Sequence, residues 1–474
     1  MSRSFLDYYR CPEGFVTLAP AEQSFGSSGF FQFGPNTVCY GRCSSGFQTK
    51  SATDELHDAL SYVVANGGTL QLPFSPSEIV SNLRQERYAT SSKAGWSLLG
   101  SGSVLRKVYY AARPHLPVSI RRHLQRIRLR DWGRIPFPKW PVDFDVELIL
   151  ETLMALLLEF HHLDNIPFIW FWPDGFPSCA IVTHDVETFA GRNFCFSLMD
   201  LDQEHGIKSS FQLIPEGRYA ISEDFLRRIR DWGCEINIHD LNHDGHLFRN
   251  KELFSRRVER INRYGKDFGA AGFRSAALYR NPDWFEALDF SYDMSVPNTG
   301  HLEAQRGGCC SVMPFFIGKI LELPVTTTQD YSLFHILNQY SIDLWERQIR
   351  LISQKHGLIS FIVHPDYLLA PRARDTYKAL LFHLADLRSA GQLWIPLPGE
   401  VNQWWRERSQ MRLVRRGDGW EIEGPGKERA SIAYASVQGD RVVYSLEPRA
   451  RPRGTDTLSI DLDARRQALA GELR

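Results

Sequence analysis

From residue 179 to about residue 396, the sequence alternates short β runs with segments of helical character. This alternation predicts a parallel sheet, because parallel strands need crossover connections and helices usually supply them. About seven or eight βα repeats in this stretch favour a barrel over an open sheet. The predicted strands are 179–184, 209–214, 235–239, 270–274, 292–296, 321–325, 358–364 and 393–396, and predicted helices between them include 223–232, 251–264, 342–355 and 375–389.

The segments on either side of these βα repeats have different residue patterns. Residues 1–164 mix short apolar stretches with Gly, Ser and Pro, which indicates a mixed α/β region of unknown role. Within it, residues 145–162 are strongly apolar with few acids, so we expect a helix that is buried around most of its surface. After residue 404, turn-separated strands are predicted at 412–414, 420–423, 430–436 and 441–446, followed by a tail at 448–474.

Charge excludes one broad class of partner. The chain of 474 residues carries 55 basic and 55 acidic side chains, so it has no overall attraction to nucleic acid, and we expect no nucleic-acid partner. Residues 106–139 are an exception, with basic residues far in excess of acids and helical spacing of the apolar residues at 119–132. This segment predicts either a peripheral contact with an anionic membrane or a phosphate-bearing glycan, or simply a solvated basic helix.

The cysteines and the first residues bear on the compartment. Eight cysteines occur without a repeated CxxC spacing, which does not support a structural zinc ribbon. The first residues contain no apolar run of signal-peptide length. We therefore expect a cytoplasmic protein with reduced thiols.

Charged and metal-capable residues occupy the ends of several predicted strands. In a βα barrel these ends and their loops converge on one face, where catalytic groups gather. Two imidazoles four residues apart can bind one cation if the backbone between them turns back helically, and one carboxylate from a neighbouring strand completes the set. The residues at or just after strand ends are Asp185, Glu187, His239, His243, Arg274 and His364, and Asp293 lies near the centre of a later strand.

Such a set of two histidines and one carboxylate leaves metal positions open to water and substrate, as a catalytic site requires. Zinc is the first choice of metal. An isolated HxxxH spacing is a weak signal in a chain with fifteen histidines, and the alternative is a pair of structural histidines.

The order of the motifs resembles a known family. THDVE, HDLNH, FRS, YDMSVP and IVHPD follow one another as in the polysaccharide deacetylase superfamily, also called the NodB-homology domain or carbohydrate esterase family 4. The resemblance spans residues 168–404. It implies an α/β fold with a distorted (β/α) barrel of about seven strands, and with the flanks it gives three expected units: an N-terminal mixed α/β domain at 1–164, the barrel at 165–404 and a small β-rich appendage and tail at 405–474.

The resemblance also implies roles for the strand-end residues. Asp185 would be the catalytic base, Arg274 its orienting partner and His364 the general acid. Asp293 corresponds to an acidic residue that the family often keeps near that histidine. The metal ligands would be Glu187, His239 and His243, holding a divalent ion, most often Zn²⁺.

Each role has a structural alternative. Asp185 could cap a helix, and Glu187 could be a first-turn acid favoured by the helix dipole. Arg274 could be a simple salt-bridge residue, Asp293 a turn former, and His364 a strand-end cap. Alternate residues of a strand share a face, so Asp185 and Glu187 would both point into the site while Val186 faces the wall.

These features predict a metal-dependent hydrolase that removes N-acetyl groups from an amino-sugar-containing saccharide, with a lipid or a nucleotide as candidate carriers of that saccharide. The proline that usually follows the motif-three arginine is absent, since Ser275, Ala276 and Ala277 follow Arg274. This departure supports the alternative of a catalytically inactive barrel that binds a glycan or a partner. A third reading keeps the metal but hydrolyses another C–N bond or an acetyl ester.

Overall fold

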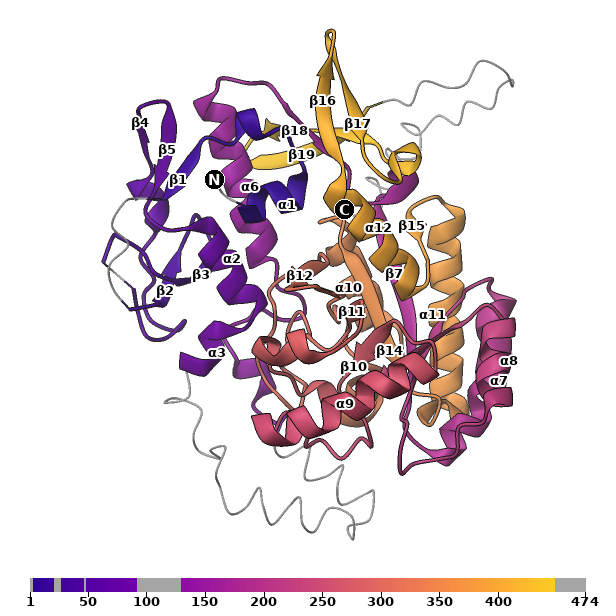
Figure 1. The fold of residues 1–474 in the computed structure, drawn as a ribbon. Coiled ribbons are helices and arrows are strands. Elements are labelled where there is room, and N and C mark those ends of the chain that lie inside the picture. The colour runs from indigo at the N-terminus through magenta and orange to yellow at the C-terminus, as the bar shows by residue number, and fades with distance from the viewer. Residues whose placement is uncertain (1–2, 21–26, 47, 92–128, 448–474) are drawn as a thin grey trace, which may run out of the picture.

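A computed structural model describes residues 3–20, 27–46, 48–91 and 129–447 of the chain (Figure 1). The N-terminal elements form one side of the molecule, and a curled sheet with covering helices forms the other. The hairpin of β16 (Arg412–Arg416) and β17 (Gly419–Glu423) projects away from both. The helices are α1 (Arg3–Tyr9), α2 (Pro76–Arg84), α3 (Arg87–Ser91), α6 (Asp145–Phe160), α7 (Phe189–Glu204), α8 (Glu223–Asp231), α9 (Lys251–Asp267), α10 (Asp343–Ser353), α11 (Pro371–Ser389) and α12 (Pro398–Gln410).

The main sheet has nine strands in the order β12-β13-β11-β10-β9-β8-β7-β14, with β15 also paired to β7. All of its pairings are parallel except that of β12 with β13. The predicted α/β class with a distorted (β/α) barrel is confirmed. Its strands are β7 (Ser178–Val186), β8 (Ser210–Leu213), β9 (Glu235–His239), β10 (Gly272–Arg274), β11 (Tyr292–Asp293), β12 (Phe315–Ile317), β13 (Ile320–Glu322), β14 (Leu358–Val363) and β15 (Leu393–Trp394).

Each of the eight predicted strands has a counterpart in this sheet, and β12 was not predicted. The strands β7 and β14 are buried on both faces along their whole length. That burial explains their continuous apolar runs, since helices cover a parallel sheet from outside. The covering helices present one apolar stripe, as in α8, where Phe225, Leu226 and Ile229 are buried.

The N-terminal residues form small sheets around α6. This helix matches the predicted segment 145–162, and it buries Ile149, Leu153 and Leu157 completely. Those side chains belong to one apolar core that also takes in strands from the C-terminal end of the chain. The N-terminal strands are β1 (Leu18–Pro20), β2 (Gly29–Gln32), β3 (Val38–Gly41), β4 (Val64–Asn66) and β5 (Thr69–Leu72).

The C-terminal strands do not stand apart from the rest. β6 (Ile166–Ile169) pairs antiparallel with β18 (Ile432–Gln438), so a strand just before the barrel completes the C-terminal sheet. The four strands predicted after residue 404 are present as β16 (Arg412–Arg416), β17 (Gly419–Glu423), β18 and β19 (Arg441–Leu446).

The tail 448–474 lies outside the described residues, and so does most of the basic segment 106–139. Its described end includes Arg130 and Arg134, whose side chains are exposed. Within the described ranges, no helix combines the length and apolar character needed to span a bilayer. The eight cysteines, all of them described, are unpaired.

Candidate active site

The candidate site lies where four parallel strands end. Asp185 is in the last two residues of β7, and Glu187 follows that strand directly. His239 ends β9 and Arg274 ends β10, while His364 follows β14. Because these strands run parallel in one sheet, their carboxyl ends bring the five side chains to the same edge.

The alternation along β7 separates the functional side chains from the wall. Asp185 and Glu187 point into the site, whereas Val186 is fully buried in the core between the sheet and its helices. The helix that follows, α7, is capped by Thr188, whose hydroxyl accepts the N–H of Gly191. Asp185 is therefore not the helix cap, and Glu187 lies before the first turn of the helix.

His243 reaches the site through an irregular loop. The sequence argument required a helical turn between the two histidines, but the backbone after His239 is not helical. Instead Asp240 and His243 adopt left-handed φ angles of 56° each. Short polar residues tolerate this conformation better than branched ones do. The turn brings the imidazoles of His239 and His243 together, tilted by 57°, with their ring centroids 4.7 Å apart.

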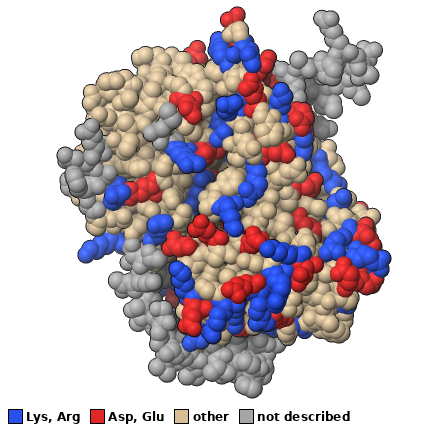
Figure 2. Space-filling model, viewed as in Figure 1, with Lys and Arg blue, Asp and Glu red and all other residues tan. Residues whose placement is uncertain are grey.

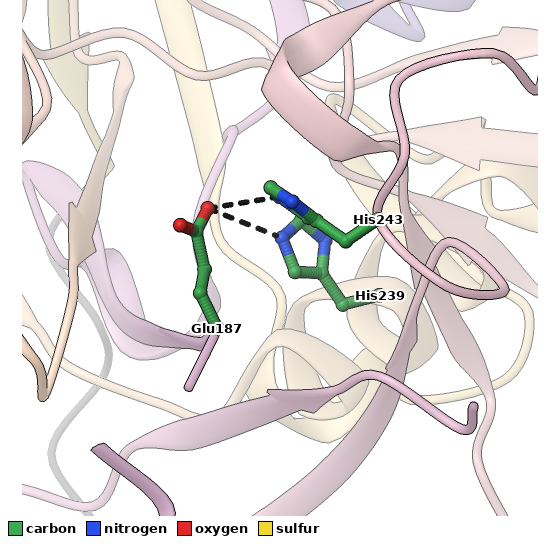
Figure 3. Close-up of side chains that lie close together, drawn as sticks. All are labelled: Glu187, His239 and His243. Atoms are coloured by element: carbon green, nitrogen blue, oxygen red, sulfur yellow. Dashed lines mark ion pairs between the residues drawn. The ribbon is translucent and has the colours of Figure 1, made fainter. Parts of the chain in front are cut away.

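Glu187, His239 and His243 converge on one point (Figure 3). Their ligand atoms all lie within 4.8 Å of one another. Oε1 of Glu187 lies 2.8 Å from Nε2 of His243 and 4.0 Å from Nε2 of His239.

The residues fit a divalent metal ion. Nε2 of His239 and Nε2 of His243 are buried, and neither makes a hydrogen bond of acceptable geometry within the described part of the chain. Nδ1 of His239 lies 3.2 Å from the carbonyl oxygen of Arg274, an acceptor that places the ring proton on Nδ1 and frees the Nε2 lone pair. Two such nitrogens and one carboxylate are the donor set of a catalytic zinc site.

The charge of the site keeps Glu187 ionised. Burial alone would raise the pKa of this carboxyl, but the charge of His243 and the close imidazoles of His239 and His364 lower it well below its usual range. A deprotonated carboxylate is the form that binds a cation.

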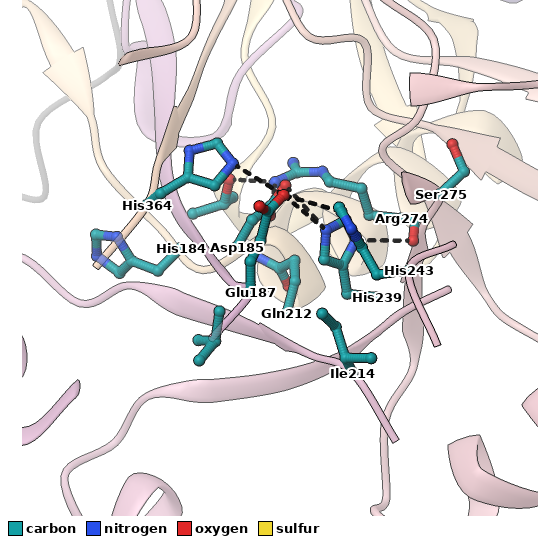
Figure 4. Close-up of polar contacts among 12 residues, drawn as sticks. His184, Asp185, Glu187, Gln212, Ile214, His239, His243, Arg274, Ser275 and His364 are labelled. Carbon is teal, nitrogen blue, oxygen red and sulfur yellow. Dashed lines mark hydrogen bonds and ion pairs between the residues drawn. The ribbon is translucent and has the colours of Figure 1, made fainter. Parts of the chain in front are cut away.

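Asp185 and Arg274 form a buried ion pair (Figure 4). Nη1 of Arg274 donates to Oδ1 of Asp185 at 2.7 Å, and the same nitrogen lies 2.7 Å from Oγ1 of Thr183. Burial opposes ionisation of Asp185, yet Arg274, His239 and His364 lower its pKa below the usual value. Oδ2 lies 3.7 Å from Nε2 of His239, so the free oxygen faces the metal-capable group.

His364 stands on the other side of Glu187, with Nε2 3.6 Å from Oε1 of that carboxylate. Its Nδ1 lies 2.6 Å from Oδ1 of Asp330, and its backbone N–H donates to Oδ2 of the same residue at 2.7 Å. Burial would lower the pKa of His364, but Asp330 and then Glu187 raise it well above its usual value. Asp330 was missed in the sequence, although it follows the predicted strand 321–325 by a few residues and could have been tested as another strand-end acid.

Asp293 has a different environment from the one expected. Among the described residues, the carboxylate against Nδ1 of His364 is Asp330, and Asp293 instead accepts the N–H and the hydroxyl of Ser295, both at 2.9 Å. The hydroxyl of Ser295 accepts the N–H of Ser275. Asp293 therefore holds the loop that follows Arg274, and burial raises the pKa of its carboxyl.

The loop after Arg274, which lacks the proline usual in the family, has strained backbone. Ala277 and Leu278 both have φ of 52°, a left-handed conformation that is uncommon for residues other than glycine. Such strain persists only where surrounding contacts impose it, and the bond from Ser275 to Ser295 is one of them.

Comparisons with known proteins give the following. No protein-family model matches the chain, and no curated protein matches it. A solved structure from Mycobacterium smegmatis, described as a polysaccharide deacetylase, is 15% identical, covers 53% of this chain and 98% of its own, and has a TM-score of 0.40. The allantoinase PuuE is 12% identical over 50% of this chain and 92% of its own, with a TM-score of 0.40.

Peptidoglycan deacetylase PdaC from Bacillus subtilis is 10% identical over 48% of this chain and 90% of its own, with a TM-score of 0.32. The polysaccharide deacetylases, which the ordered motifs resemble, are thus represented among the solved structures that this chain is similar to.

Proposed function

We propose that this chain is a metal-dependent hydrolase that removes N-acetyl groups from an amino-sugar-containing saccharide. The observation that carries the proposal is the convergence of Glu187, His239 and His243 between two buried pairs, Asp185 with Arg274 and His364 with Asp330. The order of the motifs that supply these residues supports the same reaction class.

Glu187, His239 and His243 would hold the metal ion. A divalent ion bound there supplies a lowered pKa for bound water and polarisation of a carbonyl oxygen. Zinc is the ion that the donor set favours.

Asp185 would act as the general base. Its ionised carboxylate, fixed by Arg274, accepts a proton from the water that attacks the acetyl carbonyl. Arg274 is fully buried, so it orients Asp185 without reaching the substrate.

His364 would act as the general acid. The carboxylate of Asp330 holds its ring and favours the protonated form, and Nε2 faces the site. As the C–N bond breaks, the proton from Nε2 passes to the leaving nitrogen, which would otherwise depart as an unstable anion. The products are acetate and a free amino sugar. General acid–base help of this kind typically accelerates a reaction by about 10²- to 10⁴-fold.

The test measures acetate release by the full-length protein from a panel of N-acetylated saccharides. We expect release that a chelator abolishes and added zinc restores, and that Asp185→Asn removes while the protein keeps its metal. A metal-loaded protein that releases no acetate across the panel would overturn the proposal.

The inactive barrel remains the second candidate because the loop after Arg274 departs from the family pattern. The acetate-release assay on metal-loaded protein separates the two. An inactive glycan-binding barrel would bind saccharide without turnover, and hydrolysis of an acetyl ester or another C–N bond would appear as turnover on O-acetylated or amide substrates instead. The attachment of the saccharide to a lipid or nucleotide, and the division into units 1–164, 165–404 and 405–474, stay predictions.

A further inference from the structure

A second concave site lies away from the strand-end residues. A cleft of about 470 Å³ is lined by residues of α1 and α2 on one side and by the β12–β13 turn and α12 on the other. This size is typical of small-molecule sites. Gly318, which lines the cleft, precedes β13, whereas the candidate active site follows strands that run parallel to β13. The cleft is therefore at the opposite end of the sheet from the catalytic residues.

The lining of the cleft is cationic. Among the described residues that line it, Asp7 is the one acid. In Figure 2, basic side chains gather in the middle of the face where the N-terminal elements meet the barrel. A net positive wall of this kind favours an anion with more than one charge. The lining arginines are Arg3, Arg10, Arg84 and Arg408.

Arg84 makes no salt bridge within the described part of the chain. Its Nε is buried without a hydrogen-bond partner, and its guanidinium carbon lies 5.0 Å from the ring centre of Phe315. The nearby carboxylate of Glu147 accepts the hydroxyl of Ser311 at 2.6 Å and the N–H of Val312 at 3.2 Å through Oε1, and it makes no salt bridge with Arg84, although its charge opposes part of the effect of burial on that arginine. Burial accordingly lowers the pKa of Arg84.

Arg408 is 1% exposed and also lacks a carboxylate. Its Nε and Nη2 donate to the carbonyl oxygens of Trp170, Ile169 and Tyr8, whereas Nη1 has no acceptor among the described residues. Without a compensating charge, burial lowers the pKa of Arg408 to about 9.

Two further donors beside the cleft are unused. Nε of Arg10 is buried without a partner, although Nη2 of the same side chain donates to the carbonyl oxygen of Met411 and Nη1 lies 3.7 Å from Oδ1 of Asp7. Oγ of Ser4 is likewise buried without a partner in the described structure. Buried cations and donors left unpaired cost free energy, which a bound anion would recover.

We propose that this cleft binds a small organic phosphate, at a site separate from the strand-end residues. Guanidinium groups recognise phosphate through paired, charge-assisted hydrogen bonds. Phe315, Phe316 and Trp405 also line the cleft and provide aromatic surface for an apolar portion of the ligand. The proposal does not depend on the deacetylase activity.

The test is calorimetric titration of the full-length protein with inorganic phosphate, pyrophosphate and phenyl phosphate at constant ionic strength. We expect saturable binding, tighter for pyrophosphate and phenyl phosphate than for phosphate. Arg84→Met should weaken pyrophosphate binding by roughly tenfold to a hundredfold, the range expected for losing a charged hydrogen-bond donor. The matched control is Arg347→Met on the exposed side of α10, which should bind as the wild type does.

Ser81→Asp is a second variant that keeps Arg84 and places a negative charge on the lining of the cleft, so it too should weaken binding. Hydrogen exchange on the wild-type protein needs no variant, and pyrophosphate should slow exchange in α1, α2 and the β12–β13 turn. Absence of saturable binding overturns the proposal. Binding that Arg84→Met and Ser81→Asp leave unchanged, or that gives no protection in those segments, places the anion elsewhere and also overturns it.

Discussion

Asp330 forms two hydrogen bonds with His364: Oδ1 lies 2.6 Å from Nδ1 of the ring, and Oδ2 accepts the backbone N–H at 2.7 Å. The carboxylate thus fixes both the rotation of the imidazole and the strand end that carries it. It also sets the protonation state, since its charge offsets the effect of burial on the pKa of His364.

We expect Asp330→Asn to lower kcat for acetate release by roughly 10²-fold, because a less basic His364 is a poorer proton carrier at neutral pH. The chain offers a matched control in a second buried Asp–His pair, His184 with Asp202 at 3.0 Å. His184 points away from the site (Figure 4). Asp202→Asn should lower the midpoint of thermal unfolding but leave kcat per folded molecule unchanged. An equal loss of kcat in both variants would contradict the role given to Asp330.

The metal content of variants should distinguish the proposed metal ligands from the proposed general base. Glu187→Gln and His243→Ala remove a donor atom, so zinc affinity should fall by more than the roughly 10- to 100-fold that loss of a supporting hydrogen bond costs. Asp185→Asn should keep close to the wild-type amount of metal and still lose activity. Elemental analysis after dialysis against a weak chelator gives the measurement, and retention of metal by Glu187→Gln would argue against this ligand set.

The buried carboxyl of Glu147 should make the free energy of unfolding depend on pH. Burial raises its folded-state pKa from 4.5 to about 7. The stability associated with this shift is fully present below about pH 4.5 and is lost as the pH rises through about 7, a difference of about 3 kcal/mol.

Glu147→Gln keeps an oxygen for Ser311 and Val312 but has no charge to bury. We expect the free energy of unfolding of this variant, measured with urea, to fall less between pH 5 and about pH 8 than that of the wild type. Glu159→Gln, an exposed change on the same helix, is the control and should follow the wild-type curve. Parallel curves for all three proteins would show that Glu147 does not titrate in this range.

A buried ion pair joins the N-terminal elements to the loop beyond Arg274. Arg280 and Glu86 are 4% and 5% exposed, and Nε of Arg280 donates to Oε2 of Glu86 at 2.6 Å. Glu86→Gln leaves the guanidinium buried without its counter-ion, and we expect a loss of about 3 to 5 kcal/mol in the free energy of unfolding.

The matched control is Glu78→Gln, which breaks the exposed pair with Arg42. Solvent screens that pair, so the loss in urea unfolding should be much smaller. Replacing both buried partners, Glu86→Leu with Arg280→Met, should recover much of the stability, because no unpaired charge remains. A double variant less stable than Glu86→Gln would contradict this explanation.

The sequence by itself determined the repeating elements and the residues at their ends. Strand and helix periodicity are local properties, so the eight parallel strands and helix α6 could be predicted without knowing what they contact. The same alternation placed Asp185 and Glu187 on one face of β7.

Tertiary structure alone decided which of these groups meet. Asp330 and His364 lie 34 residues apart on neighbouring segments, and nothing in the local pattern distinguishes Asp330 from Asp293 as the partner of that histidine. The pairing of β6 with β18 and the cleft between α1, α2 and α12 likewise join distant parts of the chain. Periodicity specifies which face of an element a side chain occupies. The partner of that side chain depends on how the sheet curls and on which distant elements pack together. No local window of sequence contains that information.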